Sequence, residues 1–147
     1  MSGVIDTNIL LYAVNTECVE HGEAREFLES ARSRAESHYL TEGICYEFLR
    51  VTTHPKVFPM PLQAADALGF MDVLLESPGI QLLALGETHW RRLREILAGL
   101  HHPCGNLFCD LRTAALMREN GVRTIYTADA DFLQMPDIEV VNPLKQA

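Results

Sequence analysis

Apolar residues recur along the chain in two alternating patterns, short continuous runs and longer stretches in which they return at helical spacing. The short runs predict five buried strands, at residues 3–6, 38–41, 80–85, 123–127 and 138–141. The spaced stretches predict helices over residues 22–35, 42–53, 87–98 and 108–120, and one from about Pro61 to Pro78. Strands that alternate with helices favour an α/β fold with a mainly parallel sheet covered on both faces.

Helical spacing also predicts which side of each helix faces the core. In the helix that begins near Pro61, we expect a buried face formed by Ala65, Leu68, Met71 and Leu75. In the helix at 87–98, we expect an inward face formed by Trp90, Leu93 and Leu97. Both expectations rest on spacing alone.

Length and composition fit one domain, residues 1–147, with a buried core. No apolar run is long enough to cross a bilayer and the start does not resemble a signal peptide, so we expect a cytoplasmic protein without membrane association. The four cysteines form no CxxC pair, which favours reduced thiols. A group with His101, His102, Cys104 and Cys109 lacks the usual spacing of zinc ligands.

The net charge of −8 argues against a protein that coats duplex nucleic acid by neutralising many phosphates. It does not exclude an enzyme that holds nucleic acid through a bound cation, because the charge of the ion dominates locally. Excess acid would also suit a basic protein partner.

Acidic residues stand at positions that the predicted fold brings together. Asp6 ends the first strand and Asp129 follows the strand at 123–127, so both belong to the carboxyl edge of a parallel sheet, where ligands collect. Glu47 lies along the edge of the buried stripe of the helix at 42–53, and Asp110 lies near a helix start. Purely structural roles remain open for each: helix caps for Asp6 and Asp110, an ion pair of Glu47 with Arg50, and a turn containing Asp129 and Asp131.

Several carboxylates within about 4 Å of one another would cost on the order of 4 kcal/mol per pair at an effective dielectric near 20. A hard cation removes that cost, and ligands that are all oxygen favour Mg²⁺ or Mn²⁺. The chain has no P-loop, no GxGxxG and no GxSxG. Metal-assisted attack of water on a phosphate ester is the chemistry that remains.

Four motifs occur in order along the chain: "VIDTNILLY", "YEFLRVTTHP" with Glu47, "GNLFCDLRTAAL" and "TADADF". In this order and spacing the sequence strongly resembles the PIN-domain family and, more narrowly, the VapC-type toxins of type II toxin-antitoxin pairs. The similarity continues through "HGEAREFLE", "VFPMPL" and "VVNPL". The resemblance implies a three-layer α/β/α fold, an endoribonuclease dependent on Mg²⁺ or Mn²⁺, neutralisation by a VapB-type antitoxin, and a homodimer.

The resemblance also implies roles for individual residues. The acidic quartet of the family matches Asp6, Glu47, Asp110 and Asp129, all expected to be catalytic and to bind metal, with Asp131 as an additional metal-binding acid. The supporting polar positions match Asn8 and Thr127. One departure follows Asp110, where relatives often have a small residue and a histidine but this chain has Leu111 and Arg112.

Basic residues that contact RNA are harder to place from the sequence. Arg112 and Arg118 are candidates for phosphate contacts because they follow Asp110 closely. Arg91 and Arg92 are expected on the solvent face of their helix.

Other functions stay open at this point. A PIN-like nuclease could act on DNA, or in RNA processing outside a toxin-antitoxin pair. A receiver-like signalling module also gathers acids around Mg²⁺, but neither Lys56 nor Lys145 fits the lysine it needs. A phosphatase of the haloacid dehalogenase type needs a second acid where this chain has Asn8.

Overall fold

The computed structural model describes residues 1–33 and 36–144. Within these residues, five strands form one sheet in the order β3-β2-β1-β4-β5, and every neighbouring pair is parallel. The strands are β1 (Val4–Ile5), β2 (His38–Leu40), β3 (Ile80–Leu82), β4 (Thr124–Tyr126) and β5 (Glu139–Val141). Each lies within a predicted run but is shorter than that run.

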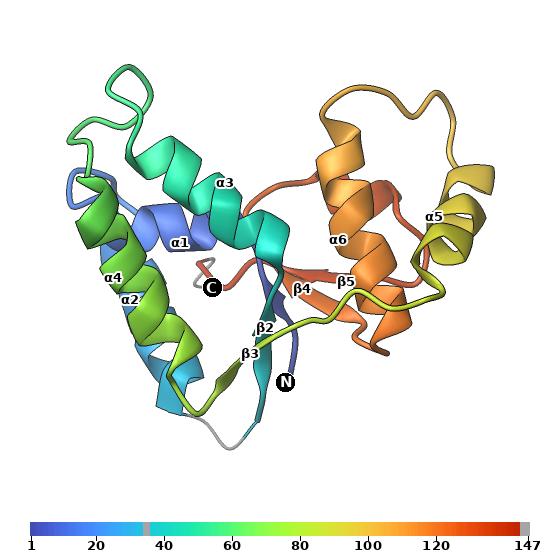
Figure 1. Cartoon of the computed structure of the whole chain (residues 1–147), viewed down its shortest axis with the longest axis horizontal. Coiled ribbons are helices and arrows are strands. Elements are labelled where there is room, and N and C mark those ends of the chain that lie inside the picture. Colours follow the sequence, from blue (N-terminus) through green and yellow to red (C-terminus); the bar gives the residue numbers. More distant parts are fainter. Residues whose placement is uncertain (34–35, 145–147) are drawn as a thin grey trace.

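Among the described residues, six helices surround this sheet, and a short 3₁₀ helix, η1 (Asp131–Gln134), follows β4. The helices are α1 (Thr7–Val14), α2 (His21–Ser33), α3 (Glu42–Thr52), α4 (Ala64–Leu75), α5 (His89–Ala98) and α6 (Leu107–Glu119). In Figure 1, α1, α2 and α4 lie on one side of the strands and α5 and α6 on the other, while α3 and α6 face each other above the sheet. This arrangement confirms the three-layer α/β/α fold.

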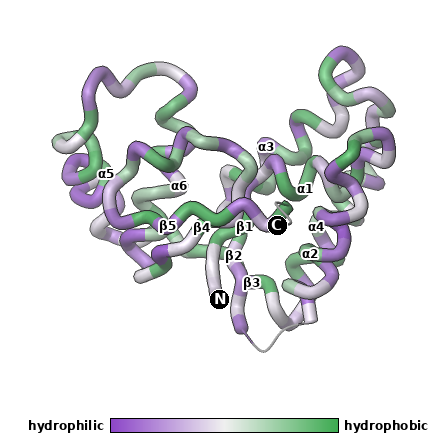
Figure 2. Tube along the Cα trace, turned by 180° about the vertical axis from the view of Figure 1, so that it is seen from behind, coloured by the Kyte–Doolittle hydropathy of each residue, from purple (hydrophilic) through white to green (hydrophobic). Residues whose placement is uncertain are grey.

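The core is continuous through the sheet and both helical layers. Fully buried side chains include Ile5 of β1, Ile9 and Leu10 of α1, Leu111 of α6 and Ile125 of β4. Figure 2 shows apolar positions running through the central strands, whereas hydrophilic positions dominate the outer helices α2 and α5. Within the described residues, no helix is both long enough and apolar enough to cross a membrane.

The predicted face of α4 is right at Met71 but wrong at Ala65, Leu68 and Leu75. Its buried residues are Ala67, Met71 and Leu74, whereas Leu68 and Leu75 are exposed. Apolar residues occupy most positions of this helix, so spacing alone does not choose one stripe. The start is also later than predicted: the Leu62 amide donates to the Thr52 carbonyl, and the helix begins at Ala64 instead of near Pro61.

The predicted inward position of Trp90 is also wrong, because its side chain is 69% exposed. Its neighbour His89 is buried instead, with Nδ1 3.0 Å from Oε1 of Glu119 on α6. The polar contact between α5 and α6 fixes the rotation of α5, and Leu93 still packs into the core as predicted.

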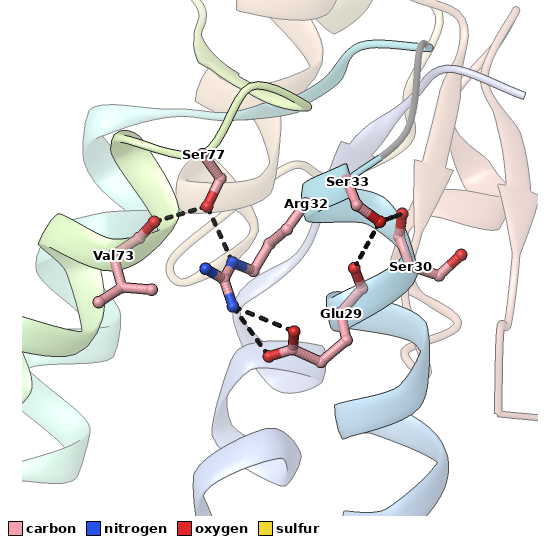
Figure 3. Close-up of polar contacts among 6 residues, drawn as sticks. All are labelled: Glu29, Ser30, Arg32, Ser33, Val73 and Ser77. Atoms are coloured by element: carbon pink, nitrogen blue, oxygen red, sulfur yellow. Dashed lines mark hydrogen bonds and ion pairs between the residues drawn. The ribbon is translucent and has the colours of Figure 1, made fainter.

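A polar cluster joins the end of α2 to the end of α4 (Figure 3). The Arg32 guanidinium donates to both carboxylate oxygens of Glu29, at 2.9 and 3.1 Å, and through Nε to Ser77 Oγ at 2.8 Å. Ser77 Oγ in turn donates to the Val73 carbonyl at 2.6 Å. We call Glu29, Arg32 and Ser77 the Arg32 clamp; its charges and hydrogen-bonding groups are matched.

Candidate active site

The candidate site begins where the sheet changes direction. From β1 the chain adds β2 and β3 on one side, and then β4 and β5 on the other, so β1 and β4 are neighbours at the switch point. Ligands of open parallel sheets bind at such points, outside the carboxyl ends of the strands. Asp6 follows β1, and its amide donates to the Tyr126 carbonyl at the end of β4. The two strand ends are thereby held together.

Thr127, only 1% exposed, is the centre of the hydrogen bonds at this junction. Its hydroxyl donates to Asp6 Oδ2 at 2.8 Å and accepts from Asn8 Nδ2 at 2.9 Å and from the Asp129 amide at 3.0 Å. One donated and two accepted bonds use the full capacity of a hydroxyl group. Asn8 Oδ1 also accepts from the Ala128 amide. Asn8 and Thr127 therefore hold Asp6 and Asp129 in fixed relative positions.

Asp6 and Asp129 also have the structural roles that the sequence left open. Asp6 is the N-cap of α1, with Oδ1 accepting from the Thr7 amide at 2.8 Å. Asp129 Oδ1 accepts from the Asp131 amide at 3.1 Å, which shapes the turn into η1. Capping and turn formation use one carboxylate oxygen of each residue, so they do not exclude a second role.

Glu47 is exposed, so the expectation that it lies along the edge of the buried stripe is wrong. It points toward the site all the same, because Thr7 Oγ1 lies 3.4 Å from its Oε2. Within the described part of the chain, Glu47 and Arg50 form no ion pair. The local salt bridge that was the alternative explanation for Glu47 is absent there.

A cleft of about 440 Å³ opens between α3 and α6. It is lined by acids from α3, from α6 and from the segment after β4: Glu47, Asp110, Asp129 and Asp131. We call it the carboxylate cleft. A larger groove of about 500 Å³ lies beside α2 and α4, but none of the predicted acidic residues lines it.

The acids of the cleft repel one another. Burial raises the pKa of Asp110 to about 7, and the negative charges of Asp6, Asp131, Asp129 and Glu47 contribute to the rise. Burial also raises the pKa of Asp6, with repulsion from Glu47 and Asp129 adding to the effect and hydrogen bonds from Thr127 and Thr7 opposing it. All five acids predicted from the sequence are therefore electrostatically coupled at one place.

This donor set suits a hard divalent cation. The side chains are oxygen ligands, and a positive ion would favour the ionised forms that burial and repulsion now disfavour in Asp6 and Asp110. Within residues 1–33 and 36–144, however, no three His, Cys, Asp or Glu side chains stand ready as ligands around one point. The metal site therefore stays a prediction.

Two arginines and an aromatic residue line the same cleft: Arg50, Arg112 and Tyr46. Sequence reasoning missed Tyr46 and assigned Arg50 only to a salt bridge. Helical spacing could have identified both residues, because positions 43, 46 and 50 lie on the same side of α3 as Glu47.

Arg118 lies about 12 Å along α6 from Asp110, and its guanidinium is 3.5 Å from the carboxylate of Glu95 and 3.7 Å from that of Asp137. It does not line the cleft.

These features define a class, parallel α/β proteins with an acidic cleft at the switch point of the sheet. The family model described as "PIN domain" matches residues 3–138. VapC ribonuclease Mb2897 of Mycobacterium bovis is 31% identical over 140 residues, covering 95% of this chain and 94% of the relative. Ribonuclease VapC48 of Mycobacterium tuberculosis is 28% identical, with 97% and 98% covered. The chain belongs to the PIN-domain family, and these full-length relatives put it with the VapC-type members.

Solved structures agree on the fold. VapBC-1 from nontypeable Haemophilus influenzae superimposes with a TM-score of 0.70 at 15% identity, over 99% of this chain and 100% of that one. VapC20 of Mycobacterium tuberculosis, described as a toxin that cleaves the sarcin-ricin loop, gives a TM-score of 0.64 at 18% identity, over 89% and 92%.

Proposed function

We propose that this chain is a metal-dependent endoribonuclease toxin that hydrolyses RNA phosphodiester bonds and is neutralised by a VapB-type antitoxin. The observation that carries the proposal is the carboxylate cleft, whose four acids are electrostatically coupled to one another and to Asp6 at the switch point of a parallel sheet. The names of the full-length relatives, which are called ribonucleases, support the same reaction.

In this proposal, Asp6, Asp110 and Asp129 hold one or two Mg²⁺ or Mn²⁺ ions, directly or through water, and Asp131 is an additional ligand. A divalent ion supplies positive charge that polarises the phosphate ester and acidifies water. Glu47, exposed at the mouth of the cleft, completes the metal shell or orients the attacking water. Hydrolysis by water leaves a 5′-phosphate and a 3′-hydroxyl on the RNA products.

The buried hydroxyl of Thr127 has a positioning role. It fixes one oxygen of Asp6 and the backbone of Asp129, so the two carboxylates approach the substrate from set directions. Preorganised ligands of this kind do not have to be ordered when the substrate binds, which lowers the cost of reaching the transition state.

The direct test is cleavage of single-stranded RNA with Mg²⁺ or Mn²⁺, comparing wild type with Asp6→Asn. Asparagine keeps one oxygen to cap α1, removes the charge, and replaces Oδ2, the oxygen that accepts from Thr127, with an amide nitrogen. Asp72→Asn on α4, outside the cleft, is the matched control. We expect cleavage by wild type and the control, and none by Asp6→Asn. Cleavage that persists in excess chelator, or 2′,3′-cyclic phosphate ends, would contradict the mechanism.

Two further points need separate tests: whether the substrate is RNA or DNA, and whether an antitoxin neutralises the chain. The site requires no 2′-hydroxyl, so DNA of the same sequence must be assayed beside RNA, and equal cleavage of both would favour the DNA-directed alternative. Solved structures of similar fold include VapBC2 of Rickettsia felis and VapBC of Salmonella typhimurium, both bound to DNA. A small basic protein encoded beside this gene, able to bind the chain and stop cleavage, is the expected antitoxin.

We also propose a homodimer. Met60, Leu68 and Val73 are exposed apolar side chains on or beside α4, surface that an interface would remove from water. Light scattering of the purified chain decides this point, and a monomeric mass at micromolar concentration would contradict it.

A further inference from the structure

Two cations beside the carboxylate cleft have no anionic partner in the described part of the chain. Arg50 and Arg112 line the cleft, and within the described residues neither guanidinium takes part in a hydrogen bond or an ion pair. Arg32, Arg92 and Arg118, by contrast, each lie within 4.0 Å of a carboxylate. Arg50 and Arg112 are therefore available to an anion that the chain itself does not supply.

Gly43 determines where Arg112 lies. A methyl group built on Gly43 would overlap the Arg112 guanidinium, so this group rests against bare backbone in the first turn of α3. The N-terminal end of a helix is electrostatically positive and disfavours a cation. Glu42 also lies in this first turn, but within the described residues no ion pair or hydrogen bond joins it to Arg112, so the guanidinium is available to a bound phosphate.

A second hollow, of about 330 Å³, adjoins the carboxylate cleft at this point. The two hollows share Gly43, Tyr46 and Arg112. Beyond them, the second hollow is lined by three leucines, Leu83, Leu85 and Leu116, and by Glu42. Tyr46 is 65% exposed at the junction. An aromatic ring, a guanidinium without an ion pair and an apolar floor therefore meet beside the acids of the carboxylate cleft.

We propose that this junction is a nucleotide subsite, which we call the Tyr46 subsite. The inference rests on the proposed ribonuclease function. The base next to the scissile bond stacks on Tyr46 over the leucine floor, and Arg112 binds the phosphate that links this nucleotide to the cleft. Aromatic rings and arginines are the groups on which unpaired RNA bases and their phosphates are bound. The subsite selects a single-stranded RNA, because a base inside a duplex cannot reach the ring.

The opposite flank of the cleft does not offer the same chemistry. A hollow of about 340 Å³ shares Asp129 with the cleft, and its other lining residues are Thr127, Ala128, Ala130, Leu133, Val140 and Asn142. None of these residues is aromatic or basic. We therefore expect the RNA to be bound more strongly on the α3 side of the cleft than on the β5 side.

The test is single-turnover cleavage of a fluorescein-labelled single-stranded RNA, with the rate followed against enzyme concentration. Tyr46→Leu and Arg112→Gln should raise the half-saturating concentration about tenfold while the maximal rate changes much less. Gly43→Ala should raise it too, by displacing Arg112 without touching a carboxylate. Tyr46→Phe should restore binding. Trp90→Leu and Arg91→Gln, which remove an exposed aromatic and an exposed cation on α5, are the controls.

The proposal is overturned if Tyr46→Leu and Arg112→Gln leave the half-saturating concentration unchanged, or if both controls raise it equally. It is also overturned if these variants weaken only the association with the antitoxin, because the junction would then be a protein-docking surface. Failure of the ribonuclease function is distinguishable. If wild type binds the labelled RNA by anisotropy but does not cut it, the same variants in the binding assay still decide the subsite. Absence of both binding and cleavage rejects both proposals.

Discussion

The Arg32 clamp and the carboxylate cleft are both clusters of charged and polar side chains, but they are built on opposite principles. In the clamp, Arg32 is matched by the carboxylate of Glu29 and the hydroxyl of Ser77 (Figure 3). In the cleft, burial and the charges of four other acids raise the pKa of Asp110, and within the described residues two arginines have no ion pair. A cluster that serves folding balances its charges internally, whereas one that leaves them unbalanced is arranged for a ligand.

Among substitutions that test this difference between the two clusters, Asp110→Asn should have the largest effect. In the proposed mechanism it removes a metal ligand, and we expect RNA cleavage to fall at least about 100-fold. The folded chain should nevertheless become more stable without divalent ions, by on the order of 1 to 2 kcal/mol near neutral pH after discounting for solvent exposure. Thermal unfolding in chelator, beside the cleavage assay, measures both effects.

The pH dependence of that gain has a definite sign. Because the pKa of Asp110 in the folded chain, about 7, exceeds the ordinary value of 3.8, its favourable contribution is complete below about pH 4 and is lost as the pH rises toward 7. The Asp110→Asn variant has no carboxyl group at this position, so it does not lose this stability as the pH rises. Its advantage in melting temperature should therefore be larger at pH 8 than at pH 4.5 and should shrink when Mn²⁺ is added. A variant that is less stable than wild type at pH 8 in chelator would contradict the charge imbalance.

Thr127→Val should have the next largest effect. Valine has the shape of threonine but leaves Asp6 Oδ2, Asn8 Nδ2 and the Asp129 amide without their shared partner. We expect a loss of about 2 kcal/mol in the free energy of unfolding and a 10- to 100-fold loss of cleavage. Urea unfolding and initial rates measure the two losses. Thr127→Ser keeps the hydroxyl and should recover most of both; no difference between Val and Ser would show that the hydroxyl does not position the acids.

The regular parts of the fold could be predicted because short apolar runs and an alternating order dictate a parallel sheet. The helix α1 was not identified. Its segment "TNILLYAV" is apolar on most sides because the helix is buried widely, at Thr7, Ile9, Leu10 and Ala13, and helical periodicity is then weak. Most of the buried face of α4 was predicted wrongly for a similar reason. Trp90 was misplaced because burial of His89 depends on Glu119, 30 residues away, which spacing within one helix does not reveal.

The acids of the site could be predicted because strand order and the switch point bring sequence-distant positions to one edge. The burial of individual side chains at the site could not be predicted. Glu47 proved exposed, and only the cross-element contact of its carboxylate with Thr7 ties it to the cleft. The relation between Gly43 and Arg112 was also beyond sequence reasoning, since it depends on how closely α6 approaches α3.

Asp129 and Asp131 allow a finer test within the cleft. The Asp129 amide is held by the buried Thr127 hydroxyl, whereas the amide of Asp131, which begins η1, is held only by the carboxylate of Asp129. We expect Asp129→Ala to abolish cleavage and Asp131→Ala to lower it only about three- to tenfold. Both should be compared at several Mn²⁺ concentrations, because a weakly held ligand affects ion affinity more than maximal rate. Equal losses at saturating Mn²⁺ would place Asp131 among the essential acids.

The smallest effect is expected at the Arg32 clamp. Arg32→Met keeps the aliphatic part of the side chain but removes the bonds to Glu29 and Ser77. Glu29 is 61% exposed and stays solvated, and Ser77 keeps its bond to the Val73 carbonyl, so the free energy of unfolding should fall by only about 1 kcal/mol. Cleavage should not change. Arg25→Met, an exposed position on the same helix, is the control for loss of a positive charge, and urea unfolding is the measurement. A balanced cluster whose loss altered cleavage as strongly as loss of Asp110 would mean that charge balance does not separate structural from functional sites in this chain.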